Sequence, residues 1–351
     1  MSPSLKSAPI TAYSRILSVG GARGELVVPN ADIVEPIKSS DEWIRRRTGI
    51  VTRRRAPREV KVEHLAEDAG RSALEASGVD ASEIDAVIVS TVSWLQSTPG
   101  MAPQVASRLG IPDAAAYDVN AGCAGYCYGI GQADAMIRSG LARHVMVIGA
   151  EKLSDIGDPT DRSLSFIIGD GAGAAVLGPS DVPGIGPTVW GSDGTKADVI
   201  TMTHSWLDFK YAEPGTVAWP TVYQEGPSVF RWVISAMPDI AERAIAEAGL
   251  TPADIDVFIP HQANLRIIES LQERLGLRDD VVVAEDIVDT GNTSGASVPL
   301  ATERLLREGQ AHGGQIALQF GFGAGLDYAA QVVVLPDRVG ETANPPVASR
   351  D

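Results

Sequence analysis

Short apolar segments alternate with amphipathic segments along most of the chain. Residues 85–91 and 144–150 are apolar runs of the length of buried strands, and residues 102–109 are expected to be helical. Residues 62–77 place apolar side chains at helical spacing on one face, at Leu65, Ala69, Ala73 and Leu74. This alternation of strands and helices predicts an α/β fold with a largely buried sheet.

A second alternating series follows a less regular, proline-containing stretch at residues 181–227. Its predicted strands are residues 257–260, 281–284, 315–320 and 328–335, and its predicted helices are residues 229–248, 264–275 and 299–308. We therefore expect two similar halves, residues 14–180 and 228–336, joined by a connector with insertions. Residues 1–13 are expected to form a loose tail, and the Pro/Ala/Ser-rich residues 337–351 to be disordered.

Composition narrows the class of protein. The 351 residues are 44% hydrophobic and 21% charged, as in ordinary globular proteins, and the net charge of −16 argues against general affinity for nucleic acid or an anionic membrane. Cys123 and Cys127 are too few for a disulfide framework or a zinc site of cysteines. No apolar run has the length of a membrane span, and residues 1–11 lack a signal-peptide pattern, so we expect a cytoplasmic protein.

Basic residues concentrate in one part of this acidic chain. Residues 45–47 and 53–55 are all arginine. They form either a solvated face or a place where an anionic partner docks.

Cys123 lies in the sequence Asp-Val-Asn-Ala-Gly-Cys-Ala-Gly-Tyr, residues 118–126. An apolar run precedes it and a long segment of small and apolar residues follows, so we expect a sharp turn between a strand and a helix. The N-terminus of a helix favours the thiolate, which is the nucleophilic form of cysteine. Cys123 is therefore a candidate nucleophile, although a lone cysteine is commonly a buried structural residue. Cys127, one helical turn further on, is expected to pack in the core.

Two other polar residues follow predicted strands or turns. His261 comes directly after the apolar residues 257–260, at the position where ligand-facing residues of α/β sheets lie. Asn292 lies in a run of small and polar residues, 290–297, that suggests a turn entering a helix. It is either a plain turn residue or a neutral hydrogen-bond donor for a developing oxyanion.

Two glycine-rich runs, residues 169–173 and 321–325, superficially resemble a dinucleotide-binding loop. Each leads into a strand-like segment, whereas the dinucleotide signature needs a following helix, so we reject that interpretation. Residues 321–325 are better explained by close approach of the backbone to a ligand, with N–H groups as donors. Cysteine proteases also combine Cys, His and Asn, but the sequence around Cys123 does not follow their local patterns.

Six motifs, taken together, point to one family. Residues 120–125 (Asn-Ala-Gly-Cys-Ala-Gly), 260–266 (Pro-His-Gln-Ala-Asn-Leu-Arg) and 291–294 (Gly-Asn-Thr-Ser) match its three active-site motifs, and segments within residues 41–50, 158–162 and 169–174 match further motifs in the same order. The chain thus resembles the β-ketoacyl-acyl-carrier-protein synthase III family from about residue 14 to about residue 336. The resemblance implies a thiolase-like fold, two similar halves stacked as five αβαβα layers, in a homodimer.

The resemblance also implies a reaction. Cys123 takes an acyl group from acyl-CoA, and malonyl-acyl-carrier protein then loses CO2 and attacks the resulting thioester. His261 and Asn292 would stabilise the enolate, and the backbone N–H groups of Cys123 and Phe322, with Gly323 as the fallback, would hold the tetrahedral oxyanion. A thiolate suits this chemistry because it both attacks and leaves, and no cofactor, whether metal or nicotinamide, is needed. The product would initiate a fatty acid or polyketide chain.

Further roles carry over by position. Trp43 would stack on the adenine of CoA, with Arg47 and Arg162 beside its phosphates, while Arg231 and Arg266 would face the acidic acyl carrier protein. Glu273-Arg274 replaces a Lys-Lys pair of the enterobacterial members, which weakens one carrier contact. In the acyl pocket, Thr98 stands where some members place a Phe, and Trp94 could partly refill the space. We therefore expect primers larger than acetyl.

Three alternatives remain open. The protein could transfer an acyl group to an alcohol or amine without forming a carbon–carbon bond, although His261 and Asn292 favour decarboxylation. It could be a non-catalytic partner subunit, against which the complete Cys/His/Asn set argues. A thiolase is disfavoured because residues 321–325 contain no second cysteine.

Overall fold

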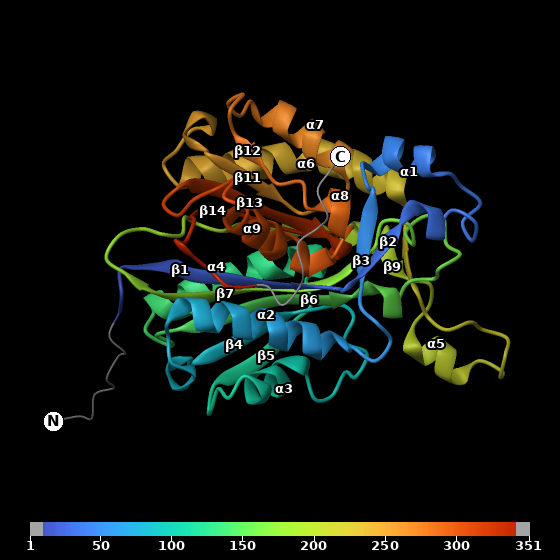
Figure 1. The fold of residues 1–351 in the computed structure, drawn as a ribbon, viewed down its shortest axis with the longest axis horizontal. Helices are drawn as coiled ribbons and strands as arrows, with labels where there is room; N and C mark the ends of the chain where they lie inside the picture. The colour runs from blue at the N-terminus through green and yellow to red at the C-terminus, as the bar shows by residue number, and fades with distance from the viewer. Residues whose placement is uncertain (1–9, 342–351) are drawn as a thin grey trace.

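The computed structural model describes residues 10–341 and contains two central sheets with helices outside and between them (Figure 1). Three helical layers and two sheets give the αβαβα order expected of a thiolase-like fold. Each sheet is covered on both faces, which explains why its strands read as nearly continuous apolar runs.

The first sheet has six strands in the order β15-β1-β7-β6-β4-β5. Strands β4, β5 and β6 are parallel, and β7 is antiparallel to both β1 and β6. The bounds are β1 (Tyr13–Arg23), β4 (Ala86–Ser90), β5 (Ala115–Val119), β6 (Val145–Lys152), β7 (Asp170–Ser180) and β15 (Arg338–Val339).

The second sheet has five strands in the order β12-β11-β13-β14-β8. Strand β11 is parallel to β12 and β13, and β14 is antiparallel to β13 and β8. The bounds are β8 (Val189–Ser192), β11 (Val257–Pro260), β12 (Val282–Val283), β13 (Ile316–Gly323) and β14 (Asp327–Val334).

Helices complete the layers. α2 (Val62–Ser77) and α3 (Met101–Arg108) cover the outer face of the first sheet, and α6 (Gly226–Glu247) and α7 (Leu265–Leu275) cover the outer face of the second (Figure 1). Between the sheets lie α4 (Gly125–Arg138) and α9 (Ser297–Arg307), each in contact with strands of both sheets. Each inner helix follows a 3-10 turn close to a candidate site residue: α4 begins two residues after Cys123, and α9 begins five residues after Asn292. The core layer therefore positions the candidate site.

Smaller elements surround this core. Two short hairpin-like sheets pair β2 (Leu26–Pro29) with β3 (Thr52–Arg55) and β9 (Ile200–Met202) with β10 (Val222–Gln224). α5 (Trp206–Tyr211) projects away from the layered body in Figure 1. α1 (Asp41–Thr48) begins at Ser40, whose hydroxyl accepts a hydrogen bond from the Trp43 N–H, and α8 (Ile287–Thr290) precedes Asn292.

Several expected boundaries differ in the structure. The predicted connector, residues 181–227, supplies strand β8 to the second sheet, where it pairs with β14. Arg338 and Val339, predicted to lie in a disordered tail, form β15 on β1. The remainder of that tail from residue 342, and residues 1–9 of the predicted N-terminal tail, lie outside the described residues.

The arginine-rich stretch divides into two parts. Arg45, Arg46 and Arg47 are exposed on α1, whereas Arg53 is fully buried in β3 and donates to the carbonyl oxygens of Val28 and Phe166. Arg53 therefore joins neighbouring segments, and residues 45–47 are the exposed part of the stretch that could meet an anionic partner.

Candidate active site

Cys123 lies on a single 3-10 turn, Gly122–Ala124, between β5 and α4. The expected strand, sharp turn and helix are thus confirmed. Gly122 has φ +51, and a Cβ on it would come within 2.8 Å of the Ala324 carbonyl oxygen. A Cβ on Gly323 would lie 2.8 Å from the Cys123 Sγ, so the two backbone segments touch at the thiol only because both positions are glycine.

The thiol of Cys123 is protonated at rest. Burial raises its pKa to about 12, and the nearby Glu151 carboxyl raises it further, while hydrogen bonding by the Ser294 side chain and the N–H groups of Cys123 and Ala324 opposes the shift. The N–H groups beside the thiol lower its pKa, in the expected direction, but burial outweighs them. The thiol must therefore lose its proton to a base, or it must become a thiolate only when the substrate binds next to the two N–H donors.

His261 follows the last residue of β11, as expected, and its side chain is buried. Burial lowers the pKa of the imidazole to about 3, so the ring is neutral. Its Nδ1 lies 2.6 Å from the Oγ of Ser297, which also accepts a hydrogen bond of 3.2 Å from the Gln262 N–H. The Phe322 ring packs edge-on against the imidazole, with 5.2 Å between ring centres.

Asn292 is fixed from both halves of the chain. Its N–H donates to the Ile167 carbonyl oxygen at 2.6 Å, and its own carbonyl oxygen accepts from the Gly169 N–H at 2.8 Å. The side-chain Oδ1 accepts from the Ser294 N–H at 2.8 Å. Because the amide oxygen is engaged in this way, the Asn292 side chain presents its NH2 group as a donor.

Cys123, His261 and Asn292 line one cavity of about 230 Å³. The structure therefore brings together the three residues that the sequence motifs single out, although they come from three separate segments. Most of the other lining side chains are apolar, including Leu153, Ile156, Leu164, Ile200, Met202 and Val222. Phe322, Gly323 and Ala324 also line it, but the backbone N–H that faces the sulfur belongs to Ala324, whereas Phe322 was expected.

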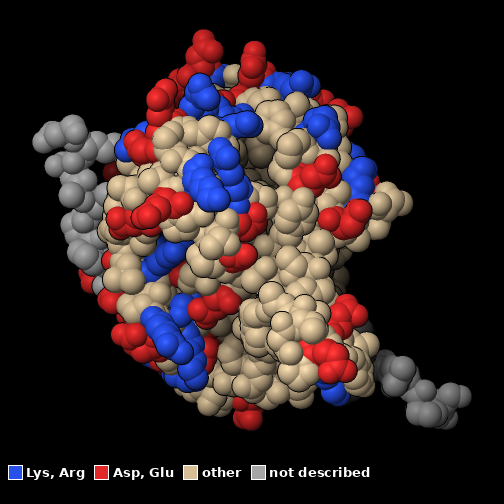
Figure 2. All heavy atoms as spheres, turned by 90° about the vertical axis from the view of Figure 1, so that its right-hand side faces the viewer, with Lys and Arg blue, Asp and Glu red and all other residues tan. Residues whose placement is uncertain are grey.

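A wider cleft of about 740 Å³ leads to this cavity and shares Gln224, Val229, Ala263 and Asn292 with it. All five residues expected to bind CoA or the carrier protein line the cleft: Trp43, Arg47, Arg162, Arg231 and Arg266. The guanidinium groups of Arg47 and Arg162 lie 5.4 Å and 4.9 Å from the centre of the Trp43 ring. Figure 2 shows Lys and Arg side chains gathered beside a hollow in the upper part of this face.

Thr98 and Trp94 lie apart from the cavity within one chain. Thr98 is exposed, and neither residue is among those that line the cavity. The Trp94 Nε1–H donates to the Pro99 carbonyl oxygen at 3.1 Å, and the ring packs against the core beneath α2 and α3.

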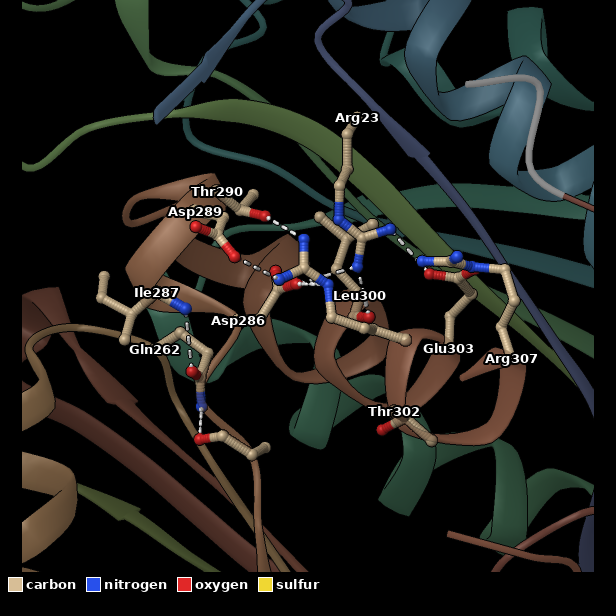
Figure 3. Close-up of polar contacts among 12 residues, drawn as sticks. Arg23, Gln262, Asp286, Ile287, Asp289, Thr290, Leu300, Thr302, Glu303 and Arg307 are labelled. Atoms are coloured by element: carbon tan, nitrogen blue, oxygen red, sulfur yellow. Dashed lines mark hydrogen bonds and ion pairs between the residues drawn. The ribbon is translucent and has the colours of Figure 1, made fainter. Parts of the chain in front are cut away.

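A buried ion-pair network supports the segment that carries Asn292 (Figure 3). Arg23 of β1 contacts Asp286 at 2.9 Å and Glu303 at 2.7 Å, and the Arg304 Nε lies 2.7 Å from the same Asp286 carboxylate. The Gln262 side chain accepts from the Ile287 N–H at 3.1 Å, which links the His261 segment to α8. Removing one partner of such a buried pair typically destabilises a protein by about 3–5 kcal/mol.

Four groups of the site were missed by sequence reasoning: the side chains of Ser294, Ser297 and Glu151, and the backbone N–H of Ala324. The two serines look like ordinary residues at the start of a helix, and Ala324 lies in a glycine-rich run without a polar side chain. Glu151 gave one signal, since it directly follows the apolar run 144–150, and a charged residue is unexpected in a buried strand.

Two kinds of feature were not found within residues 10–341. No three or more His, Cys, Asp or Glu side chains cluster as metal ligands in this part of the chain. The helices of the same part include none with the length and apolar character needed to cross a bilayer.

Comparison with known proteins agrees with this geometry. The family model described as 3-Oxoacyl-[acyl-carrier-protein (ACP)] synthase III matches residues 117–194, and the model of its C-terminal part matches residues 245–335. A β-ketoacyl-[acyl-carrier-protein] synthase III of Streptomyces coelicolor is 52% identical, with 94% of this chain and 98% of that protein covered. The corresponding protein of Kocuria rhizophila is 50% identical over 93% and 97% of the two chains. This chain belongs to the 3-oxoacyl-acyl-carrier-protein synthase III family.

Solved structures support the same assignment. The priming β-ketosynthase from the R1128 polyketide biosynthetic pathway is 47% identical, with a TM-score of 0.92 over 95% of this chain and 99% of that one. The Thermus thermophilus synthase III is 40% identical, with a TM-score of 0.84 over 92% and 99%. The expected thiolase-like fold is confirmed. The synthase is an enzyme, and the expected decarboxylative condensation of an acyl-CoA with malonyl-acyl-carrier protein, which initiates fatty acid or polyketide chains, is confirmed as the family activity.

Proposed function

We propose that Cys123 carries the acyl group and that His261 and Asn292 drive decarboxylation of the malonyl thioester. The observation that supports this assignment is the shared cavity, which holds one thiol, one neutral imidazole and one amide donor at the end of a basic cleft. These are the nucleophile and the donors that a decarboxylative Claisen condensation requires.

In the first half-reaction the Cys123 sulfur attacks the carbonyl carbon of the acyl-CoA. A tetrahedral oxyanion forms, CoA leaves as a thiolate, and an acyl-cysteine remains. We place the oxyanion against the N–H groups of Cys123 and Ala324, in place of the Phe322 N–H expected from the sequence, because these two groups face the sulfur.

In the second half-reaction the malonyl thioester loses CO2 and becomes an enolate. Ser297 accepts the Gln262 N–H and has a hydroxyl proton to donate to His261 Nδ1, which leaves the imidazole proton on Nε2. Nε2–H and the Asn292 NH2 group then hydrogen-bond the enolate oxygen. The carbanion attacks the acyl-cysteine, and Cys123 is released. These steps use only the thioester substrates and the chain's own groups.

The apolar cavity walls favour a primer larger than acetyl. Each additional CH2 buried there contributes roughly 0.8 kcal/mol of transfer free energy. Thr98 and Trp94 do not reach the cavity of their own chain, so their proposed place in the acyl pocket requires a second copy to bring this loop to it. β5 ends the first sheet and leaves its outer edge open, which supports a homodimer formed along that strand.

The cleft can accept CoA in the first half-reaction and the prosthetic arm of the acyl carrier protein in the second. An adenine stacked on Trp43 would lie against the Arg162 or Arg47 guanidinium, and both cations are close enough to meet its phosphates. Arg231 and Arg266 at the rim would face an acidic acyl carrier protein.

Both cysteines are free thiols, as expected in the cytoplasm.

Two measurements test this function. Intact mass after exposure to a panel of acyl-CoAs, from acetyl to longer and branched chains, reports the acyl-enzyme and the primers that form it. Labelled CO2 released from malonyl-acyl-carrier protein reports condensation. An acyl-enzyme that transfers its group to an alcohol or amine without releasing CO2 would replace this proposal by simple acyl transfer.

A further inference from the structure

Glu151 is a fully buried carboxyl group close to the reactive thiol, and the condensation described above does not use it. It is 0% exposed, although acidic side chains are almost never fully buried without a partner. No salt bridge to it occurs within residues 10–341: the next residue, Lys152, turns away to the Pro57 carbonyl oxygen and Asp155. An unpaired buried carboxyl is expensive, and such groups concentrate at functional sites.

Neutral donors surround this carboxyl. Ser93 Oγ donates to it at 2.6 Å, and the Val92 N–H lies 3.2 Å from both oxygens. Thr91 Oγ1 is 3.4 Å away, and the register partner on β7 is Gly171, which has no side chain. Cys123 is a titratable group near Glu151, since the charge of the Glu151 carboxyl raises the pKa of its thiol. Burial raises the pKa of Glu151 to about 7, while these hydrogen bonds limit the shift, so its carboxyl changes protonation state near neutral pH.

Ser294 connects the two groups. Ser294 has φ +47, an uncommon conformation for a residue other than glycine. Its N–H donates to the Oδ1 of Asn292. Its Oγ is buried, and no hydrogen bond of good geometry satisfies it among the described residues. Ser294 lines the same cavity as Cys123, and a Cβ on the next residue, Gly295, would lie 3.7 Å from the Glu151 Oε1. The Ser294 side chain also lowers the pKa of both groups. A hydroxyl can accept one proton while it donates its own, so Ser294 is suited to a relay.

We propose that Glu151 accepts the proton of the Cys123 thiol through the hydroxyl of Ser294. The inference rests on Cys123 being the acyl carrier. A buried thiol does not ionise readily, and the relay removes its proton only as the acyl donor arrives. The N–H groups of Cys123 and Ala324 are already in place beside the sulfur.

The proton balance closes over the two half-reactions. In acylation the S–H bond breaks and the new S–C bond forms, the thiol proton passes to Ser294, and the Ser294 proton passes to Glu151. CoA leaves as a thiolate and takes a proton from water. In condensation the S–C bond breaks, the departing Cys123 thiolate recovers a proton from Ser294, and Glu151 returns to the carboxylate.

The test follows the pH dependence of two reactions of Cys123 between about pH 5.5 and about pH 9.5. One is alkylation by iodoacetamide, a neutral reagent that reports the thiolate whether or not the protein is a synthase. The other is single-turnover acylation by an acyl-CoA, followed by intact mass. Both are measured in a Cys127→Ala background, which removes the second thiol.

Wild type is expected to show a rise in both rates centred near pH 7, where Glu151 becomes a carboxylate. Glu151→Gln, which is nearly isosteric, should lose this inflection, with a rate near pH 7 about 100-fold lower and rising tenfold per pH unit. Ser294→Ala should behave alike, because it breaks the relay and leaves Glu151 in place. Ser93→Ala removes a hydrogen bond to the carboxylate, so the inflection should move to higher pH without loss of the plateau.

A rate that falls in Glu151→Gln while the inflection near pH 7 persists would overturn the proposal and leave Glu151 a structural role. If Glu151→Gln does not fold, Ser294→Ala and Ser93→Ala decide by the same criterion. Normal pH-dependent alkylation without any acyl adduct would instead contradict the assigned function and leave the relay standing.

Discussion

His261 Nδ1 lies 2.6 Å from the Oγ of Ser297 in a fully buried pair. The serine is the first residue of α9, and the histidine begins the loop after β11, so the layer between the sheets sets the orientation of the imidazole. With the pKa of the ring lowered to about 3 by burial, the histidine is a neutral hydrogen-bond donor and does not act as a cation. This neutral state suits the role that we propose for it, as a donor to the carbonyl oxygen that becomes negative during decarboxylation.

His261→Ala and Asn292→Ala are each expected to lower decarboxylation of malonyl-acyl-carrier protein by about 100-fold to 1,000-fold, because each removes one donor to the enolate oxygen. The acyl-enzyme should still form, since neither side chain is the nucleophile. Labelled CO2 release and intact mass separate the two steps. A variant that lost acylation as completely as a Cys123 variant would show that its side chain serves the first half-reaction.

Ser297→Ala is expected to lower decarboxylation by about tenfold, less than His261→Ala, because the imidazole stays but loses its tautomer restraint. Ser297→Thr, which keeps the hydroxyl, should recover part of the rate. The comparison uses CO2 release at saturating substrate together with acylation as the internal control. Equal rates for Ser297→Ala and the wild type would remove Ser297 from the mechanism.

Cys123→Ser is expected to abolish the acyl adduct, because a serine hydroxyl in this buried position is a far weaker nucleophile than the thiol. Cys127→Ala is the matched control: it removes a buried thiol one turn along α4 and should leave the adduct intact. Both are compared by intact mass after incubation with the same acyl-CoA. An adduct on Cys123→Ser would assign the acyl group to another residue.

Cys123, His261 and Asn292 could be predicted as site residues because each lies in a short local motif, the first two next to a strand end and Asn292 in a turn before an inner helix. The relay and supporting groups could not. Ser297 and Glu151 contact partners that are distant in sequence. Nothing local distinguishes Ser297 from an ordinary helix residue, and the charge of Glu151 at the end of an apolar run does not indicate which groups it meets. The thiol pKa also escaped prediction, since burial depends on the whole cavity and outweighs the helix end that the sequence displays.

The fold could be predicted to a similar depth. The two halves could be predicted from their long apolar strands and amphipathic helices. β8 and β15 could not, because they are short and are strands only through pairing with the edges of β14 and β1. Thr98 illustrates the limit of a motif: its alignment with a pocket position says nothing of which chain's pocket it would meet, and in its own chain it lies on the surface.

A larger side chain in the apolar cavity should narrow the choice of primer. Ile200→Phe is expected to leave acetylation within about threefold of wild type and to slow acylation by branched or longer acyl-CoAs by at least tenfold, because overpacking costs about 1–3 kcal/mol. Leu141 is exposed on the surface, so Leu141→Phe is the control. Competition between acetyl-CoA and a branched acyl-CoA, read by intact mass, measures the ratio directly. An unchanged ratio would place the acyl group elsewhere.

Charge reversal at the rim of the cleft should affect the carrier protein more than CoA. Arg231→Glu and Arg266→Glu are expected to raise KM for malonyl-acyl-carrier protein by about tenfold, with a weaker dependence on salt, because each replaces an attractive by a repulsive contact. Acylation by acyl-CoA should change by less than about threefold. Arg243→Glu, an exposed position of α6 outside the cleft, is the control. Equal losses for both substrates would assign these arginines to CoA.

Glu151 should affect the pH dependence of the free energy of unfolding as well as that of the reactions of Cys123. Burial raises its pKa from 4.5 to about 7, so the folded protein binds this proton more tightly than the unfolded chain does. The stabilising effect is complete below about pH 4.5 and disappears as the pH rises through about 7, a loss of roughly 3 kcal/mol for the wild type relative to Glu151→Gln. Urea unfolding of the two proteins at matched concentrations across this range measures the difference, with Glu59→Gln, an exposed position, as the control. Parallel stability curves for wild type and Glu151→Gln would mean that Glu151 has the same pKa in the folded and the unfolded chain, so that its carboxyl would not change protonation state near neutral pH.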